Sequence, residues 1–110
     1  MKLSQNAIIA REKLTNYLLI HKKRNDKSAW LAKAGYALDN WEILEIDLRN
    51  QILSQNAVEA EKTEFGQMFE ISGLLLGPNG KGLSVITIWM IDRITGNTRF
   101  ITMYPDKISA

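Results

Sequence analysis

The stretch HKKRNDK, residues 21–27, places the single histidine of the chain among four of its fourteen basic residues. An imidazole accepts or donates a proton near neutral pH, and a lysine or arginine beside it stabilises negative charge. These groups suit the cleavage of RNA by its own 2′-hydroxyl, which needs two proton carriers and a cation at the phosphate. The alternative is a solvated helix end, where the helix dipole favours a protonated His21.

A second proton carrier must differ from His21, and Tyr104 and a lysine are the candidates. Thr87 and Trp89 alternate along one predicted strand. Thr102 and Tyr104 alternate along the next. The two pairs share one sheet face if the connecting hairpin has an even number of loop residues, and an odd loop separates them. Ordinary packing in the core and at its rim is the alternative for Trp89 and Tyr104.

Other chemistries find less support in the residue types. One histidine and no cysteine leave carboxylates as metal ligands, and Glu59 and Glu61 have no evident third partner. Gly77, Gly80 and Gly82 surround a predicted hairpin and do not join a strand to a helix, so they fit neither a P-loop nor a dinucleotide fingerprint. We therefore expect no metal and no cofactor.

Length and composition predict one domain over residues 1–110, because 45% of the residues are apolar and no long polar tract interrupts them. The absence of cysteine suits a reducing compartment. No window reaches the roughly 18 apolar residues of a membrane span, and the first residues lack the features of a signal peptide. We expect a cytoplasmic protein with no membrane partner.

Charge is distributed unevenly although the net charge is only +2. Residues 1–35 carry eight basic and two acidic side chains, whereas residues 36–70 carry two basic and eight acidic ones. A basic first third attracts polyanions such as RNA. The alternative, that the two segments neutralise each other in the fold, stays open because sequence separation does not give separation in space.

Hydrophobic periodicity predicts the elements that must position these groups. Apolar residues recur with helical spacing in residues 10–20, in a short segment that ends at residue 34 after a cap at Asn25 or Asp26, and in residues 39–54. The period then changes to that of strands, which we place at residues 58–61, 67–76, 83–91 and 99–104. The fold class is therefore α+β, with about three N-terminal helices followed by a four-stranded antiparallel meander sheet.

The order of several motifs resembles a family of small bacterial proteins of unknown function. These proteins occur alone and as C-terminal tips of large secreted polymorphic toxins. The resemblance covers residues 13–105 through KLTNYLL, His21, Lys27-Ser28-Ala29, AGYALDNWEIL, EFGQMFEISGLLLGPNGKG, VITIWMI and RFITMYP. Its most specific parts are the GPNG turn, the T-x-W strand and the closing T-x-Y-P. The helices-then-sheet layout also resembles the barnase–EndoU–colicin–RelE superfamily of metal-independent ribonuclease toxins.

This resemblance implies a ribonuclease toxin that cleaves RNA, with transfer RNA as the expected substrate and a small cognate antitoxin or immunity protein as partner. It places His21 and Lys27 on the helical side of a cleft and the threonines and aromatic residues on the sheet side. The expected catalytic residues are His21, Lys27, Thr87 and Tyr104, and the expected RNA-binding residues are Lys22, Lys23, Arg24, Trp89 and Thr102. Relatives tend to have a glycine between the histidine and the lysine, where this chain has Lys23-Arg24-Asn25.

Two alternatives remain open at this point. One is a non-catalytic interaction module, such as an immunity or adaptor protein, in which the acidic segment of residues 36–70 is as important as the basic start. The other is an RNA-binding protein that does not cleave, whose affinity falls steeply with increasing salt.

Overall fold

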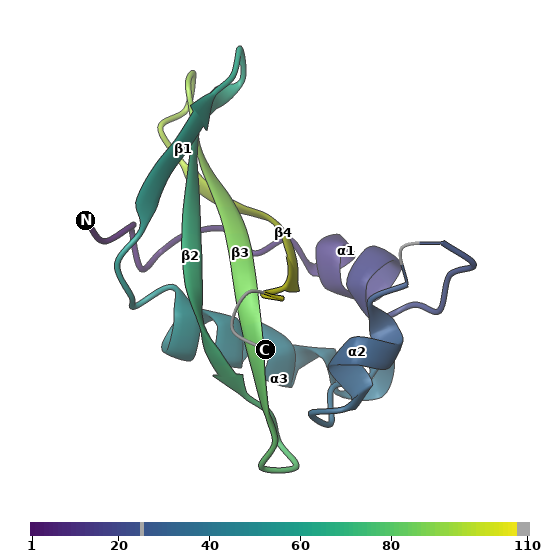
Figure 1. Ribbon diagram of the computed structural model, residues 1–110. Coiled ribbons are helices and arrows are strands. Elements are labelled where there is room, and N and C mark those ends of the chain that lie inside the picture. The colour runs from purple at the N-terminus through teal and green to yellow at the C-terminus, as the bar shows by residue number, and fades with distance from the viewer. Residues whose placement is uncertain (25, 108–110) are drawn as a thin grey trace.

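A computed structural model describes residues 1–24 and 26–107. Short helices come first, and a four-stranded antiparallel sheet follows (Figure 1). This confirms the predicted α+β class and the meander topology, because the strands lie in the order β1-β2-β3-β4. No helix in these residues is long and apolar enough to cross a membrane.

The helices occupy the predicted segments but are interrupted. The helical elements are α1 (Arg11–Lys13), which continues as the π-helical turn η1 (Leu14–Leu18), α2 (Ser28–Ala32), the 3₁₀ turn η2 (Leu38–Asn40), α3 (Trp41–Asp47) and the π-helical turn η3 (Leu48–Ile52). The Leu19 N–H bonds to the Leu14 carbonyl at 2.9 Å, which is the i to i+5 bond of a π-helical turn. The capping position of α2 is held by Lys27, while Asp26 accepts the N–H of Ser28. The alternative cap, Asn25, lies outside the described residues.

The strands are β1 (Val58–Lys62), β2 (Gly66–Leu76), β3 (Gly82–Asp92) and β4 (Thr98–Pro105). β3 pairs with β2 on one side and β4 on the other, as its β-branched and aromatic residues predicted. The β2–β3 turn contains Asn79-Gly80, and Gly80 adopts a φ of +87°, which glycine tolerates. Ile8 forms a parallel bridge with Arg99, so the N-terminal segment lies along the start of β4.

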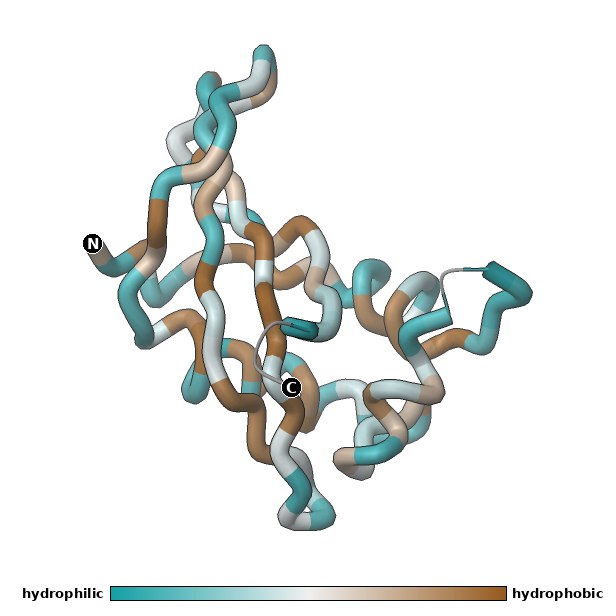
Figure 2. The backbone as a smooth tube through the Cα atoms, in the orientation of Figure 1, coloured by the Kyte–Doolittle hydropathy of each residue, from teal (hydrophilic) through white to brown (hydrophobic). Residues whose placement is uncertain are grey.

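The helices cover one face of the sheet and form the core with it. Alternating hydrophobic and hydrophilic positions follow the central strands (Figure 2). The buried apolar side chains of the helices are Leu14, Leu18, Leu31, Leu44, Leu48 and Ile52, and those of the strands are Phe69, Ile71, Leu75, Leu83, Val85, Trp89, Phe100 and Met103. Among the residues described, the helices lie on one side of the sheet (Figure 1).

A one-residue bulge in β4 decides which of its side chains point away from the core. Near the turn, Trp89 pairs with Phe100, but the next residue of β3, Ile88, pairs with Thr102. Ile101 is therefore the extra residue. If Ile101 paired with Ile88 and there were no bulge, the register at Trp89 would continue and place Thr87 opposite Thr102. With the bulge, Thr87 lies opposite Met103 in the core, and Thr102 lies opposite Ile88, outside the buried core.

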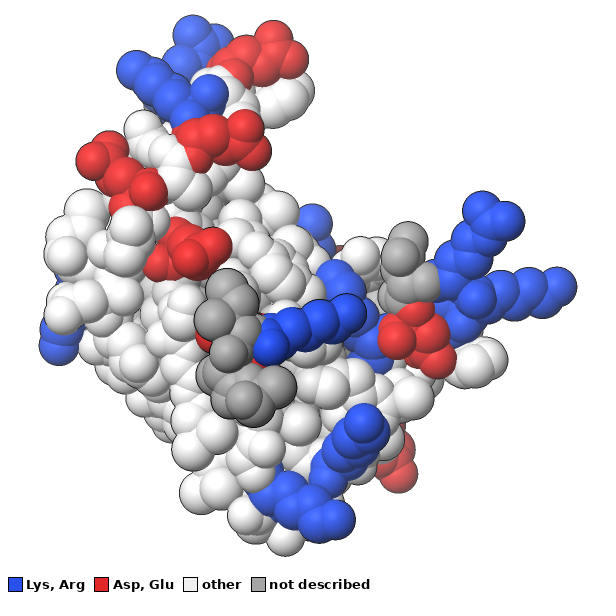
Figure 3. All heavy atoms as spheres, viewed as in Figure 1, with Lys and Arg blue, Asp and Glu red and all other residues white. Residues whose placement is uncertain are grey.

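On the face drawn in Figure 3, basic side chains extend from the region before α2, and acidic side chains follow β1 at a different place. The ion pairs His21–Asp26 and Glu45–Arg49 each join residues of the same segment. The basic region therefore keeps positive charge that is available to an anionic ligand.

Candidate functional site

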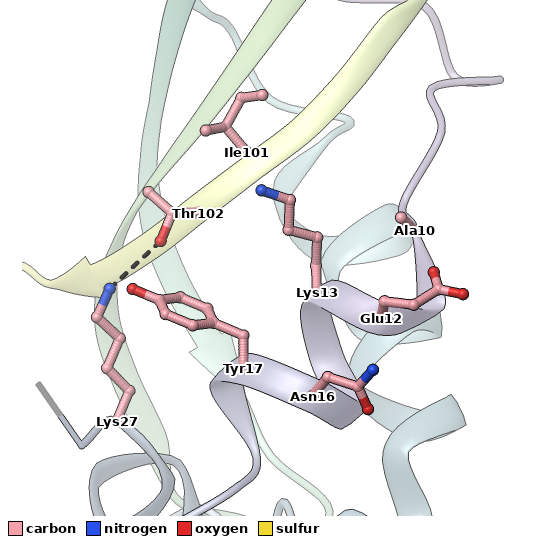
Figure 4. A pocket seen from close by; sticks show the side chains of 8 residues that line it. All are labelled: Ala10, Glu12, Lys13, Asn16, Tyr17, Lys27, Ile101 and Thr102. Carbon is pink, nitrogen blue, oxygen red and sulfur yellow. Dashed lines mark hydrogen bonds between the residues drawn. The ribbon is translucent and has the colours of Figure 1, made fainter. Parts of the chain in front are cut away.

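A pocket opens between the first helical segment and the edge strand β4 (Figure 4). Its volume is about 540 Å³, which is within the range of ligand-binding pockets. The side chains around it supply two ammonium groups, a phenol and three further polar groups, one of them a carboxylate, against an apolar wall. They come from Ala10, Glu12, Lys13, Asn16, Tyr17, Lys27, Ile101 and Thr102.

Lys27 reaches from the helical side of this pocket to β4. Its Nζ donates a hydrogen bond to Oγ1 of Thr102 at 3.3 Å. The backbone beside it is fixed by Asp26, whose Oδ1 accepts bonds from the N–H and the hydroxyl of Ser28 at 2.9 and 2.6 Å. The Ser28 hydroxyl is the main cause that lowers the pKa of Asp26; desolvation opposes it, and the Ser28 N–H and His21 add to it. The structure thus joins two residues predicted on opposite sides of a cleft.

Tyr17, one of the residues with helical apolar spacing in the segment 10–20, forms an aromatic wall of the pocket. Lys22 Nζ lies 3.7 Å from the centre of its ring, and Lys27 Nζ lies 5.3 Å away, both within the range of cation–π interactions. Figure 4 shows its hydroxyl directed toward Lys27 and Thr102. Tyr17 lies in the π-helical turn η1, and such turns are frequent at functional sites. The available signal was the polar tip of a tyrosine within an apolar stripe.

Three polar residues of the same helical segment also line the pocket and were not predicted, namely Glu12, Lys13 and Asn16. Lys13 extends toward Ile101 on β4, whereas Glu12 and Asn16 point outward at the rim (Figure 4). Lys13 precedes Tyr17 by four residues, and residues at that spacing share a helix face. This spacing was the signal that places a second cation beside the aromatic wall.

His21 lies outside the pocket lining, in the part of the chain that leaves η1 and extends away from the sheet (Figure 1). Its side chain is 85% exposed, and its Nδ1 contacts Oδ2 of Asp26 at 2.9 Å. The structure therefore does not bring the imidazole into one hollow with Tyr104 and Trp89. It connects His21 to the pocket through Asp26, the residue before Lys27.

The predictions of Thr87 as a catalytic residue and Trp89 as an RNA-stacking residue are wrong in position. Both side chains are 0% exposed. The Thr87 hydroxyl donates to the Ile71 carbonyl at 2.9 Å and accepts the indole N–H of Trp89 at 2.7 Å. The Trp89 ring packs edge-on against Phe100, with the ring centres 5.2 Å apart. Both residues are on the face of β3 that packs in the core, and the bulge in β4 places Phe100 and Met103 opposite them in place of Thr102 and Tyr104.

Thr102 and Tyr104 lie opposite Ile88 and Ile86 of β3, outside the buried core, and the Thr102 hydroxyl contacts Lys27. Thr102 lines the pocket, and Tyr104 follows two residues later on β4, partly exposed and outside the lining. The predicted RNA-binding residues Lys23 and Arg24 are exposed, and Lys22 is partly buried against Tyr17. Their role in RNA binding stays a prediction.

Comparisons with known proteins give a family and a fold. Residues 2–107 match the family model described as Domain of unknown function (DUF6883). One chain of the structure described as a contact-dependent growth inhibition toxin–immunity protein complex from Klebsiella pneumoniae 342 superposes with a TM-score of 0.64. The likeness covers 91% of this chain and 100% of that chain at 18% sequence identity, so it shows a shared fold alone. The search of curated proteins found no match.

Proposed function

Because the chain belongs to the DUF6883 family, whose description assigns no activity, we propose a function from the pocket: a metal-independent ribonuclease toxin. The observation that carries the proposal is the Lys27 ammonium group held against the Thr102 hydroxyl, at the mouth of a pocket with a second cation, Lys13. This combination of a positive charge, a hydroxyl and an aromatic wall matches the requirements of a phosphodiester joined to a base.

The proposed reaction needs no external nucleophile. The ribose 2′-oxygen attacks the adjacent phosphorus, loses its proton and forms a new P–O bond, while the bond to the 5′-oxygen breaks and that oxygen gains a proton. The products are a 2′,3′-cyclic phosphate and a free 5′-hydroxyl. Lys27 stabilises the extra negative charge on the phosphorus oxygens, and Thr102 donates a hydrogen bond to one of them.

His21 remains the proposed carrier of one proton, and the contact with Asp26 supports this role. A carboxylate on Nδ1 orients the imidazole and leaves Nε2 free to exchange a proton. Asp26 also accepts hydrogen bonds from Ser28, so one carboxylate contacts both the imidazole of His21 and the start of α2 next to Lys27. Catalytic hydrogen bonds often form only when the substrate binds. RNA bound across the exposed imidazole of His21 would bring its reacting oxygen next to Nε2. Tyr104 is the proposed second proton carrier, since it follows Thr102 on the same face.

A toxin that cuts RNA requires a protein that inhibits it in the producing cell. The similar fold in a toxin–immunity complex supports such a pairing but does not say which member this chain corresponds to. We propose a small, acidic immunity protein that covers Lys27 and the basic residues Lys22, Lys23 and Arg24. The proposed substrate is a structured RNA in the cytoplasm, with transfer RNA as the first to test.

Purified protein incubated with total transfer RNA in EDTA tests the proposal. Cleavage with 2′,3′-cyclic phosphate ends is expected, and Lys27→Ala and His21→Ala should each reduce its rate by at least about 10²-fold. Lys33→Ala is the matched control, because it removes an exposed charge next to the same short helix but outside the pocket, and it should cut at the wild-type rate. Intact RNA after prolonged incubation, or equal cleavage by Lys27→Ala, would refute the assignment.

A non-catalytic interaction module is the second candidate, and the exposure of β1 favours it. All five residues of this edge strand are exposed, and an exposed edge pairs readily with a strand of another protein. Such a module would leave cell growth unaffected when expressed alone, and a Glu59→Pro substitution at the edge would abolish binding of its partner. A toxin would instead arrest growth, and Lys27→Ala would relieve the arrest.

A further inference from the structure

The pocket has features that a phosphate alone does not require. A phosphate needs cations and hydrogen-bond donors, yet most of the lining is apolar and includes the ring of Tyr17. Lys13 and Lys27 approach this ring from different elements, and Figure 4 shows their ammonium groups on two sides of it. The hollow between them is bounded by Ile101 and Thr102 of β4.

We propose that this hollow binds one unpaired nucleotide of an RNA loop, with its base stacked on Tyr17 and its two flanking phosphates next to Lys13 and Lys27. The inference rests on the proposed ribonuclease function and names the class of its substrate: RNA with a nucleotide that is neither paired nor stacked in a helix. Duplex RNA is excluded as a substrate, because a paired base has both faces covered by its neighbours and cannot enter a pocket in the protein surface.

The state of the Tyr17 ring supports a role as a stacking platform. The ammonium group of Lys22 lies over the ring at 3.7 Å, yet Lys22 is not part of the pocket lining. Lys22 therefore covers part of the ring, and Tyr17 still lines the pocket. The backbone that carries Tyr17 is held by helical packing, because Leu14 and Leu18 of the same turn η1 are fully buried.

The base identity is not read by this arrangement. Glu12 and Asn16, the polar groups nearest the open end, point outward and not over the ring (Figure 4). Stacking on an aromatic side chain accepts every base, since each has a π-face. Selection then depends on whether the nucleotide is unpaired, and we expect similar binding of loops that differ only in that base.

The experiment uses a hairpin RNA with 2-aminopurine at one loop position and a 2′-deoxyribose at the same nucleotide. Without the 2′-hydroxyl, this nucleotide cannot be cleaved at its 3′ phosphate, so binding is measured separately from catalysis. Wild-type protein is expected to quench the 2-aminopurine fluorescence. Tyr17→Phe should retain the quenching, and Tyr17→Leu should weaken affinity by about 5- to 100-fold, the range for loss of one base–aromatic stack.

Phe65→Leu is the matched control, because it also replaces an aromatic residue by leucine but lies at the β1–β2 turn, away from the pocket; Phe65 is exposed, whereas Tyr17 is partly buried. Phe65→Leu should bind the hairpin like wild type. Thermal unfolding should show that Tyr17→Leu is folded; if Tyr17→Leu is not folded, Tyr17→Ile and Tyr17→Met take its place. Quenching without cleavage of the all-ribose hairpin would overturn the ribonuclease function and support the nucleotide site. Cleavage that proceeds equally on duplex RNA, or with Tyr17→Leu, would overturn the nucleotide site alone.

Discussion

Thr87 and Thr102 lie on the neighbouring strands β3 and β4, and we expect one to contribute to stability and the other to RNA cleavage. Thr87→Val keeps the shape of the side chain but removes its hydroxyl. The indole N–H of Trp89, fully buried, then loses its acceptor, and the bond to the Ile71 carbonyl disappears. A buried donor without a partner costs about 1–3 kcal/mol, and the lost bond adds about 0.5–1.5 kcal/mol. We expect Thr87→Val to destabilise the protein by about 2–4 kcal/mol, which lowers Tm by about 8–16 °C.

The same substitution at Thr102 should have the opposite effect. Its hydroxyl is partly exposed and bonds only the Lys27 ammonium group among the contacts described, so the loss in stability stays within about 1.5 kcal/mol. Under the proposed mechanism this hydroxyl donates to the phosphate in the transition state, and removal of one such donor lowers the rate by about 10²-fold. Thr102→Val is therefore a stable and nearly inactive variant.

Urea denaturation and single-turnover RNA cleavage at 20 °C measure both quantities on the same preparations. Cleavage by Thr87→Val, corrected for its folded fraction, should equal that of wild type, because the residue is 0% exposed and contacts no substrate. If Thr87→Val unfolds like wild type but loses cleavage, the assignment of Thr87 to the core is wrong. If Thr102→Val cleaves at the wild-type rate, Thr102 has no part in the reaction.

Three further predictions test the fold around the site. Burial raises the pKa of Tyr36 above its usual range, and so does the hydrogen bond that its hydroxyl donates to the Asp47 carboxylate. Tyr36 therefore ionises first in the unfolded state, and the free energy of unfolding should fall by about 1.4 kcal/mol per pH unit above about pH 10. Tyr36→Phe should lack this dependence in urea titrations. Gly77→Ala should lower the free energy of unfolding by about 1–3 kcal/mol in the same titration, because its Cβ would collide with the Ala34 carbonyl. Deletion of Ile101 should leave a regular hydrogen-bond ladder between β3 and β4 and a near-normal midpoint of urea denaturation. It should reduce RNA cleavage at least tenfold, because Ile101 lines the pocket.

The sequence was sufficient for the order and type of the elements, because the hydrophobic period changes near residue 57 and the Asn79-Gly80 turn separates two strands. It also indicated Lys27 and Thr102, which the structure joins. It was insufficient for the direction of His21, since the path of a loop depends on single contacts such as the one between Asp26 and Ser28. These contacts leave no periodic pattern in a sequence.

The face on which a strand residue lies depends on register, and register can change by one residue without any change in composition. Phe100 and Met103 are both buried although they are three positions apart, which strict alternation forbids. The packing of Phe100 against Trp89 and the burial of Met103 both need the bulge at Ile101. The same bulge turns Thr102 outward toward Lys27. The hydrophobic core therefore determines the geometry of the pocket, and a chain that packed β4 without the extra residue would lose the Ile101 wall on which the proposed nucleotide site depends.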